Sequence, residues 1–358
     1  MFDACIIGAG GVVGAAIARE LAQRDLSIVG IETHPKPCQE TSGRNSRVIH
    51  SGFHETPGTL KARLAREGSE LMIRYAEERA IPLLPTGMLI AVPYGGIRAG
   101  LWKEARALWQ LWRQGRRQGI PFNFILTPGG VRSLAPIRAR AGIFIPSVCV
   151  VDVEALVKSV IEDARAAGAQ LLFGTEVTDI KTDGTRHVVR GADTQIEARV
   201  LINSAGLCAH EISVMAGGPA YEMEFIRGDY YELVGGVDRW GIRTLVYPAM
   251  PPRSRSKGIH FGPRTDGRLY IGPSATQEWE QPPKELFLAA ARKFVPEIRP
   301  DDLQWAYCGL RPKHGADFTI KLERSRPPLI NLIGIDSPGL SASMAIARHV
   351  AEIVLSVQ

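Results

Sequence analysis

The first 32 residues constrain the fold more strongly than any other part of the chain. The segment FDACIIGAGGVVGAAIARELAQRDLSIVGIE predicts a strand, a glycine-rich turn, a helix with a stripe of small and apolar residues, and a second strand that ends in Glu32. In such a unit Gly8 permits the tight turn, and Gly10 lets the backbone approach a pyrophosphate at the N-terminus of the helix. The carboxylate of Glu32 is placed to bind the hydroxyls of a ribose. The segment therefore predicts a right-handed βαβ unit that binds a dinucleotide.

The glycine spacing departs from the usual GxGxxG form. Val13 stands where the third glycine is usual, the glycine falls at Gly14, and Gly11 is an additional one, so the spacing is GxGxxxG. One more residue in the turn keeps a phosphate cradle possible but changes its geometry. The strand, the helix and the acidic residue are all present, so the prediction rests on the complete unit. The expected dinucleotide contacts are Gly8, Gly10, Gly11, Gly14 and Glu32.

Composition limits the class of protein. The chain has 358 residues, enough for two domains with a substantial core. Its net charge of +6 fits an anionic substrate, an anionic cofactor or a negatively charged surface, and it fits solubility alone equally well. The five cysteines have no CxxC pair and no metal-ligand spacing, so we expect no disulfide framework and no metal site. With a strand expected so close to the first residue, and no apolar run of about 20 residues, we expect a cytoplasmic protein.

The order of the expected strands and helices divides the chain into alternating parts. Thr59 is expected to cap a helix that ends near Ala80. Short strands separated by glycine and proline between Tyr221 and Trp305 indicate an antiparallel sheet, and the last segment returns to strand, glycine turn and long helix. We therefore expect a discontinuous nucleotide-binding domain of residues 1–80, 141–220 and 306–358, and a substrate domain of residues 81–140 and 221–305.

The segment IRAGLWKEARALWQLWRQGRRQG predicts a helix that carries Trp102, Trp109 and Trp112 within one sector, beside six lysines and arginines. A helix of this kind can lie on a membrane surface. It can also pack its tryptophan face on the second domain, and this alternative is favoured because aromatic stripes at helical spacing usually belong to a core.

Six sequence blocks carry a resemblance that covers nearly the whole chain. They are NSRVIHSG followed by PGTLKARL, then IRGDYYEL, LVYPAMPP, GIHFGPRTDGRLYIGP, YCGLRPK and IDSPGL. In this order they resemble the FAD-dependent oxidoreductases of the D-amino-acid-oxidase type, and within them the L-2-hydroxyglutarate dehydrogenase/oxidase branch. The resemblance implies a Rossmann-like FAD-binding domain of the glutathione-reductase type, combined with a mixed, largely antiparallel sheet. It also implies oxidation of an L-2-hydroxy acid, in the first instance L-2-hydroxyglutarate to 2-oxoglutarate, by hydride transfer to flavin.

Other activities occur on the same scaffold. Sarcosine, glycine or D-amino-acid oxidases and glycerol-3-phosphate dehydrogenases are alternatives, although NSRVIHSG and RGDYYEL favour the hydroxy acid. A flavin-bearing subunit or sensor is a non-enzymatic alternative. The electron acceptor implied is quinone, oxygen or a carrier, and a quinone would place the protein at the inner face of the membrane. No nucleic-acid partner is expected.

The resemblance also implies the residues that bind FAD. The polar stretch after the second strand would line the pyrophosphate and the flavin ring, a small-residue turn and the backbone of one valine would contact the adenosine half, and the start of the last helix would stabilise negative charge on the reduced flavin. These residues are Thr41, Ser42, Arg44, Asn45 and Ser46, then Val177, Ala205 and Gly206, and finally Pro338, Gly339, Leu340 and Ser341. Some relatives attach flavin covalently through a histidine at the place of Arg44, which arginine excludes, and others through a cysteine at the place of Cys308. Non-covalent FAD is expected.

Oxidation of a 2-hydroxy acid requires a base for the hydroxyl proton, and a histidine suits this role because its ordinary pKa lies near 6.5. His50 and His260 both lie within matching blocks and the choice between them is open, whereas His54 stands where the branch often has an aromatic residue. By resemblance, Arg311 would bind the substrate carboxylate through its planar fork. The candidates for a second carboxylate are Tyr247, Arg264 and Lys313.

Overall fold

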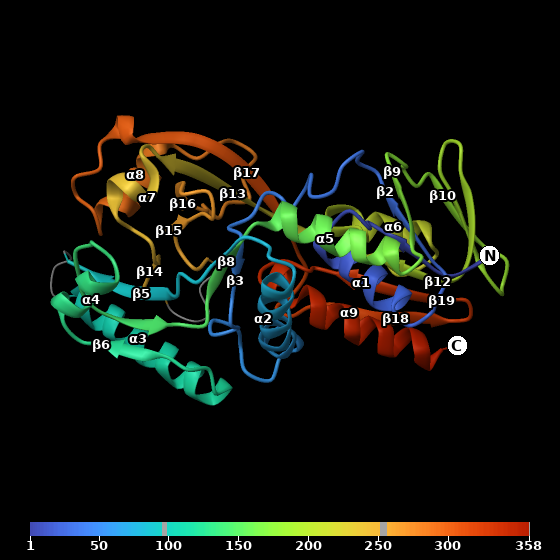
Figure 1. Cartoon of the computed structure of the whole chain (residues 1–358), viewed down its shortest axis with the longest axis horizontal. Helices are drawn as coiled ribbons and strands as arrows, with labels where there is room; N and C mark the ends of the chain where they lie inside the picture. The colour runs from blue at the N-terminus through green and yellow to red at the C-terminus, as the bar shows by residue number, and fades with distance from the viewer. Residues whose placement is uncertain (95–98, 251–255, 358) are drawn as a thin grey trace.

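The computed structural model describes residues 1–94, 99–250 and 256–357, and of residues 99–105 the backbone alone. Figure 1 shows two lobes, with both chain termini at the end of one lobe and the strands β13 to β17 in the other. Between them lie the helix α2 (Leu60–Glu78) and the short strands β3 (Val48–Ile49), β4 (Leu83–Leu84) and β8 (Cys149–Val151), which pair in the order β3-β8-β4. The side chain of Thr59 accepts a hydrogen bond from the backbone of Ala62, which confirms the expected cap of α2.

The first lobe is built on an eight-stranded sheet, counted within the described residues. Its central strands β12, β1, β2 and β9 run parallel, β19 adds in parallel beside β12, and β10, β11 and β18 form antiparallel edges. Their bounds are Phe2–Ile7 (β1), Ile28–Glu32 (β2), Gln170–Phe173 (β9), Asp179–Thr182 (β10), His187–Arg190 (β11), Gln195–Asn203 (β12), Thr319–Ser325 (β18) and Pro328–Ile333 (β19). The expected Rossmann-like domain is confirmed.

Helices cover both faces of this sheet. The apolar faces of α1 (Val12–Ala22) and α9 (Gly339–Ser356) share one buried core with β1, β12 and β19. The helix α5 (Val153–Ala166) packs beside α1, and α6 (Ala209–Met215), preceded by the 3-10 turn η1 (Gly206–Cys208), covers the opposite face. Parallel strands buried on both faces require such layers.

The long glycine turn is accommodated at the start of α1. Gly8 has a φ of +87°, which glycine adopts without strain, and α1 begins at Val12 with Gly11 as its N-cap. A Cβ atom on Gly14 would lie 2.2 Å from the carbonyl oxygen of Gly8. Gly14 therefore allows the close approach of helix and turn that the third glycine of the usual motif provides, in spite of the additional residue.

The second lobe holds a mixed, largely antiparallel sheet, as expected. Its strand order is β17-β13-β16-β15-β14-β5-β7-β6, and the β14–β5 pair is parallel. The bounds are Met88–Pro93 (β5), Asn123–Ile125 (β6), Ala139–Ile145 (β7), Glu224–Leu233 (β13), Leu245–Pro248 (β14), His260–Pro263 (β15), Leu269–Gly272 (β16) and Leu303–Lys313 (β17). Around it lie α3 (Ala99–Gln118), α4 (Pro128–Leu134), α7 (Gly236–Trp240), α8 (Lys284–Arg292) and the 3-10 turn η2 (Pro300–Asp302).

Two of the expected domain boundaries fall inside strands of the second sheet. The strand β7 begins at Ala139, so a boundary after residue 140 divides it, and β17 continues to Lys313, so a boundary before residue 306 divides it as well. Both strands pair along their length with neighbours in the second sheet. The second lobe is therefore longer at both places than the sequence pattern suggests.

The tryptophan-bearing helix α3 is half core and half surface. Leu111 is fully buried and Trp112 packs on the same apolar cluster, whereas Trp109 is 51% exposed. The side chain of Trp102 lies outside the described residues. The favoured packing on the second lobe thus holds for one part of the sector only. In the described part of the chain, no helix has the length and apolar character needed to cross a bilayer.

Candidate active site

A cavity of about 930 Å³ is lined by residues of both lobes. A volume of this size lies at the upper end of the range for ligand sites. Most of the residues predicted from the sequence lie on its wall. These are Gly8, Gly10, Gly11, Gly14, Glu32, Thr41, Ser42, Arg44, Asn45, Ser46, Val177, Ala205, Gly206, Pro338, Gly339 and Leu340 among the predicted cofactor ligands, and His50, Tyr247, His260, Arg311 and Lys313 among the predicted substrate and catalytic residues.

At one end of the cavity the glycine turn meets the carboxylate of Glu32. One carboxylate oxygen accepts a hydrogen bond from the backbone of Gly10 at 2.9 Å, and the other accepts one from the backbone of His34 at 3.0 Å. A Cβ atom on Gly10 would lie 2.6 Å from this carboxylate, so the contact requires glycine. At the start of α1 the backbone of Val12 donates to the hydroxyl of Ser42 at 3.0 Å. These contacts bring an acidic side chain and a helix N-terminus together, as a nucleotide ribose and pyrophosphate require.

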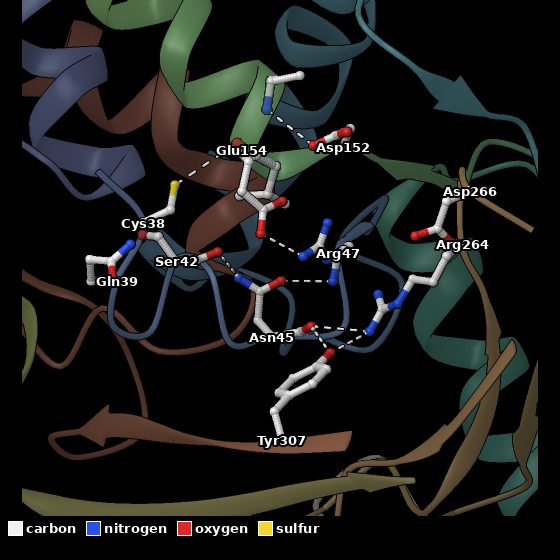
Figure 2. A network of polar contacts seen from close by, with 12 residues as sticks. Cys38, Gln39, Ser42, Asn45, Arg47, Asp152, Glu154, Arg264, Asp266 and Tyr307 are labelled. Atoms are coloured by element: carbon white, nitrogen blue, oxygen red, sulfur yellow. Dashed lines mark hydrogen bonds and ion pairs between the residues drawn. The ribbon is translucent and has the colours of Figure 1, made fainter. Parts of the chain in front are cut away.

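The loop that carries residues 41–47 is shaped by the side chain of Asn45 (Figure 2). Its amide nitrogen donates to the carbonyl oxygens of Thr41 at 3.0 Å and Ser42 at 2.6 Å, and its oxygen accepts from the backbone of Arg47 at 2.7 Å. Arg47 in turn pairs with Glu154 of α5 at 2.5 Å. Asn45 therefore turns the loop back on itself, and Thr41 and Ser42 line the cavity.

Arg264 holds the same loop from the second lobe and does not line the cavity. Its guanidinium donates to the carbonyl oxygens of Ser46 and Asn45, and to the hydroxyl of Tyr307 at 2.5 Å. The Tyr307 hydroxyl donates to the carbonyl of Asn45 at 2.9 Å. Figure 2 shows the two side chains converging on Asn45. This placement corrects the sequence-based expectation for Arg264, because its guanidinium binds two loop carbonyls and the Tyr307 hydroxyl and is not part of the cavity wall.

Ser341 has a comparable supporting role. Its hydroxyl is fully buried and accepts a hydrogen bond from the backbone of His50 at 2.8 Å. It thus joins the end of β3 to the first turn of α9, and it does not line the cavity. Pro338, Gly339 and Leu340, which precede it, do.

Three histidines of the cavity wall gather around the ring of Tyr247. They are His50, His54 and His260. Burial, followed by the positive charge of Lys257, lowers the pKa of both His50 and His54 well below the usual value. Burial lowers the pKa of His260 to about 3. The three imidazoles are therefore neutral near pH 7, the form that accepts a proton.

Hydrogen bonding distinguishes His260 from His50. The Nδ1 atom of His260 lies 3.3 Å from the carbonyl oxygen of Gly258. A carbonyl only accepts, so Nδ1 carries the proton and Nε2 keeps its lone pair. The Nδ1 atom of His50 is buried and has no hydrogen-bond partner among the described residues. His260 is thus held in the tautomer that a base at Nε2 requires.

Arg311, on β17, has donor capacity left over. Its Nη2 atom is buried and makes no hydrogen bond within the described part of the chain. A buried guanidinium nitrogen without an acceptor is costly, and an anion in the cavity removes that cost. Two residues before it on β17, a Cβ atom on Gly309 would lie 2.0 Å from the carbonyl oxygen of Arg44. The strand therefore approaches the loop more closely here than a residue with a side chain would allow.

Among the wall residues that the sequence analysis does not predict, four have polar or aromatic contacts that bear on the site. Tyr230 lies in the quoted IRGDYYEL block and stacks on Tyr307 with ring centroids 4.7 Å apart. His54 is not a candidate for the base on sequence grounds, because the branch often has an aromatic residue there. Glu55 and Lys257 form an ion pair of 3.1 Å across the cavity wall, and no local sequence signal links positions 202 residues apart.

The residues present fit an FAD molecule. The wall combines the close glycine approaches, the carboxylate of Glu32, two helix N-termini and a polar loop in one continuous cavity. Cys308 is not among the residues that line it. These features also match a known family: the model of the FAD dependent oxidoreductases, called DAO, matches residues 3–353.

Known proteins that are similar to this chain include dehydrogenases and an oxidase. A glycerol 3-phosphate dehydrogenase from Caloramator mitchellensis is 28% identical over 369 residues, which cover 100% of this chain and 74% of that protein. The mitochondrial L-2-hydroxyglutarate dehydrogenase of Arabidopsis thaliana is 28% identical over 410 residues, covering 98% of this chain and 82% of that protein. Among solved structures, the dithionite-reduced L-alpha-glycerophosphate oxidase of Mycoplasma pneumoniae with FAD bound has a TM-score of 0.88 at 26% identity, and the match covers 99% of this chain and 94% of that one. With the family model matched from residue 3 to residue 353, this chain belongs to the FAD dependent oxidoreductases and FAD is its cofactor.

Proposed function

We propose that the protein oxidises L-2-hydroxyglutarate to 2-oxoglutarate with non-covalently bound FAD. The observation that carries this proposal is the buried Nη2 of Arg311, which no described residue binds, on the same wall as the neutral imidazole of His260. A 2-hydroxy acid presents a carboxylate and an adjacent hydroxyl, which need these two groups. The blocks that resemble the L-2-hydroxyglutarate branch, and the relatives that carry that name, support the same substrate.

The chain's own residues would perform three tasks. The fork of Arg311 binds the carboxylate next to the carbinol carbon and thereby orients that carbon. The Nε2 atom of His260 takes the hydroxyl proton, and the bond from Nδ1 to the Gly258 carbonyl holds the imidazole in place. The buried wall around the histidines excludes water from the transfer. When bound, FAD supplies the acceptor for the hydride that leaves the carbinol carbon.

Glycerol 3-phosphate is a second candidate substrate. It is favoured by two of the matches, a dehydrogenase and an oxidase named for this compound. Its phosphate would use the same arginine, and its secondary hydroxyl would need the same base. The two candidates differ in charge and shape at the anionic group, so direct comparison separates them.

The deciding experiment mixes the purified flavoprotein, without oxygen, with L-2-hydroxyglutarate, glycerol 3-phosphate, glycine, sarcosine or a D-amino acid. Loss of the visible flavin absorbance reports reduction. We expect L-2-hydroxyglutarate to reduce the flavin fastest. Faster reduction by glycerol 3-phosphate or by an amine would overturn the proposal in favour of that substrate. Reduction by none of them would favour the non-enzymatic alternative.

The acceptor is proposed to be a quinone at a membrane face, with oxygen and a soluble carrier as the alternatives. The support is an exposed apolar and basic surface on α3 and the strand that follows it, which we call the α3 surface. It consists of Trp109, Arg113, Arg116, Arg117, Phe124 and Leu126. Such a combination suits an interface with anionic lipid.

A further inference from the structure

Glu55 and Lys257 are brought together on the cavity wall from distant parts of the chain. Glu55 follows β3, and Lys257 precedes β15 by three positions. The Lys257 Nζ atom lies 3.1 Å from a carboxylate oxygen of Glu55, and the two side chains are 27% and 12% exposed. Both line the cavity that also holds the histidines.

Glu55 is the fixed member of this pair. Its backbone carbonyl oxygen accepts hydrogen bonds from the side-chain amides of Gln114 and Gln118 of α3, each at 2.7 Å. Its backbone nitrogen donates to the carbonyl of Gly52 at 2.9 Å. Lys257 has three donor hydrogens, and the contact with Glu55 uses one of them. The ammonium group is thus held at the wall, and within the described part of the chain its other donors have no partner.

Lys257 and Arg311 line the same cavity as the proposed base His260. The charges of both act on His260, as does that of Arg264 from behind the loop, and Lys257 also acts on His50 and His54. A molecule with an anionic group at each end, held by Arg311 and Lys257, would carry its central atoms past His260. A dicarboxylate whose oxidised carbon lies near one end is a molecule of this kind.

The other cations of the wall are less suitable for the second anionic group. Lys61 is paired with Asp336 at 2.6 Å, beside the start of α9. Arg44 belongs to the loop predicted to bind the cofactor. Lys313 lies on the wall, but its charge is not among those that act on the three histidines.

We propose that Lys257, positioned by Glu55, binds the second carboxylate of the substrate and selects dicarboxylates over monocarboxylates. This inference rests on the proposed function, because it names the group that recognises the far end of the same substrate. Lys257 acts as a binding residue and Glu55 as a positioning residue. As the candidate for binding the second carboxylate, Lys257 with its partner Glu55 takes the place of Arg264, which is turned away from the cavity.

The test compares L-2-hydroxyglutarate with L-2-hydroxyvalerate, which has a methyl group in place of the second carboxylate. We expect Lys257→Met to lower kcat/KM for the dicarboxylate about 30-fold or more, since one partner of a buried charge pair is lost. The value for L-2-hydroxyvalerate should change little, so the preference collapses. Glu55→Gln should raise KM for the dicarboxylate and leave kcat nearly unchanged, because the ammonium loses its fixed position. Lys158→Met, at an exposed position of α5, is the matched control.

A binding experiment separates this proposal from the proposed function. Glutarate and valerate are not 2-hydroxy acids, and their binding is followed by the change in the flavin absorption spectrum without turnover. Loss of glutarate binding in Lys257→Met, with valerate binding unchanged, supports Lys257 even if L-2-hydroxyglutarate is not oxidised by the wild type. Unchanged glutarate binding in both Lys257→Met and Lys257→Gln, with FAD retained, overturns the proposal. Loss of the preference in Lys313→Met alone overturns it as well.

Discussion

The phenol ring of Tyr247 stacks on the imidazole of His260, with ring centroids 3.9 Å apart and planes inclined by 14°. Both side chains are buried, and the imidazole is also held through Nδ1 by the carbonyl of Gly258. The ring of His260 is therefore fixed on one face and at one edge. This constraint leaves Nε2 as the atom that can exchange a proton, whereas Nδ1 of His50 has no such support from the residues that the structure describes.

Replacing the proposed base tests this geometry. In His260→Asn we expect kcat with L-2-hydroxyglutarate to fall by about 100- to 10,000-fold, the contribution typical of a general base, with FAD content unchanged. In His50→Asn the fall should be much smaller. Stopped-flow measurement of flavin reduction gives both rates. The reverse order of the two variants would assign the base to His50.

Arg311 should control substrate binding. Truncating one partner of a buried charge pair costs about 2–5 kcal/mol, so Arg311→Ala should raise the apparent substrate Kd by about 30-fold or more. Arg311→Lys should recover part of this loss, because it restores the charge but not the planar fork. Titration of the flavin spectrum with substrate measures both values. Wild-type affinity in Arg311→Ala would exclude this residue from the site.

Arg264 should affect the cofactor and leave the substrate preference unchanged. Removal of its bonds to the carbonyls of Asn45 and Ser46 in Arg264→Met loosens the loop predicted to line the flavin, so we expect FAD affinity to fall by about 10- to 100-fold, which corresponds to one or two charge-assisted hydrogen bonds. The control is Arg268→Met. Arg268 lies over the same Tyr270 ring but pairs with exposed Asp266. Equal FAD affinity in both variants would contradict the assignment.

Stability should decrease as the pH falls below neutrality. The pKa of His187 is lowered to about 4 and that of His260 to about 3, in each case chiefly by burial, whereas an unfolded histidine titrates near pH 6.5. Below about pH 6.5 the unfolded chain binds more protons, so the free energy of unfolding falls until the folded pKa is reached.

The measurement for this prediction is urea unfolding at pH 7 and pH 5. His187 does not line the cavity, and its Nε2 atom is 3.0 Å from the carbonyl of Pro328. His187→Gln should therefore reduce the loss between the two pH values by about 1–2 kcal/mol. A free energy of unfolding that rises on acidification would contradict the prediction.

Membrane association can be tested by flotation. We expect the protein to float with vesicles that contain anionic lipid at low salt, and to be released at high salt because the attraction of Arg113, Arg116 and Arg117 is screened. At low salt, Trp109→Ala should float less than the wild-type protein. A protein that stays at the bottom of the gradient at low salt lacks this association.

Much of the fold could be predicted from local sequence. The glycine turn, the strand that ends in Glu32 and the Thr59 cap depend on neighbouring residues, and the structure confirms them. The boundaries at residues 140 and 306 could not be placed, because a strand sequence does not reveal which sheet it joins.

The candidate site, too, could be predicted from the sequence only in part. Arg311 and the histidines lie within recognisable blocks, so their positions on one wall could be expected. The direction of the Arg264 guanidinium could not, because it depends on the backbone of a loop 218 residues away. The Glu55–Lys257 contact has no sequence signal for the same physical reason.

The alternation of the chain between the two sheets has a practical consequence for dissecting the protein. The first sheet takes strands from residues 2–32, 170–203 and 319–333, and the second takes strands from residues 88–145 and 224–313. A single cut in the backbone therefore cannot release one lobe intact, and a fragment shortened from either end loses part of a sheet. Separate expression of either half would require rejoining non-adjacent segments with new linkers.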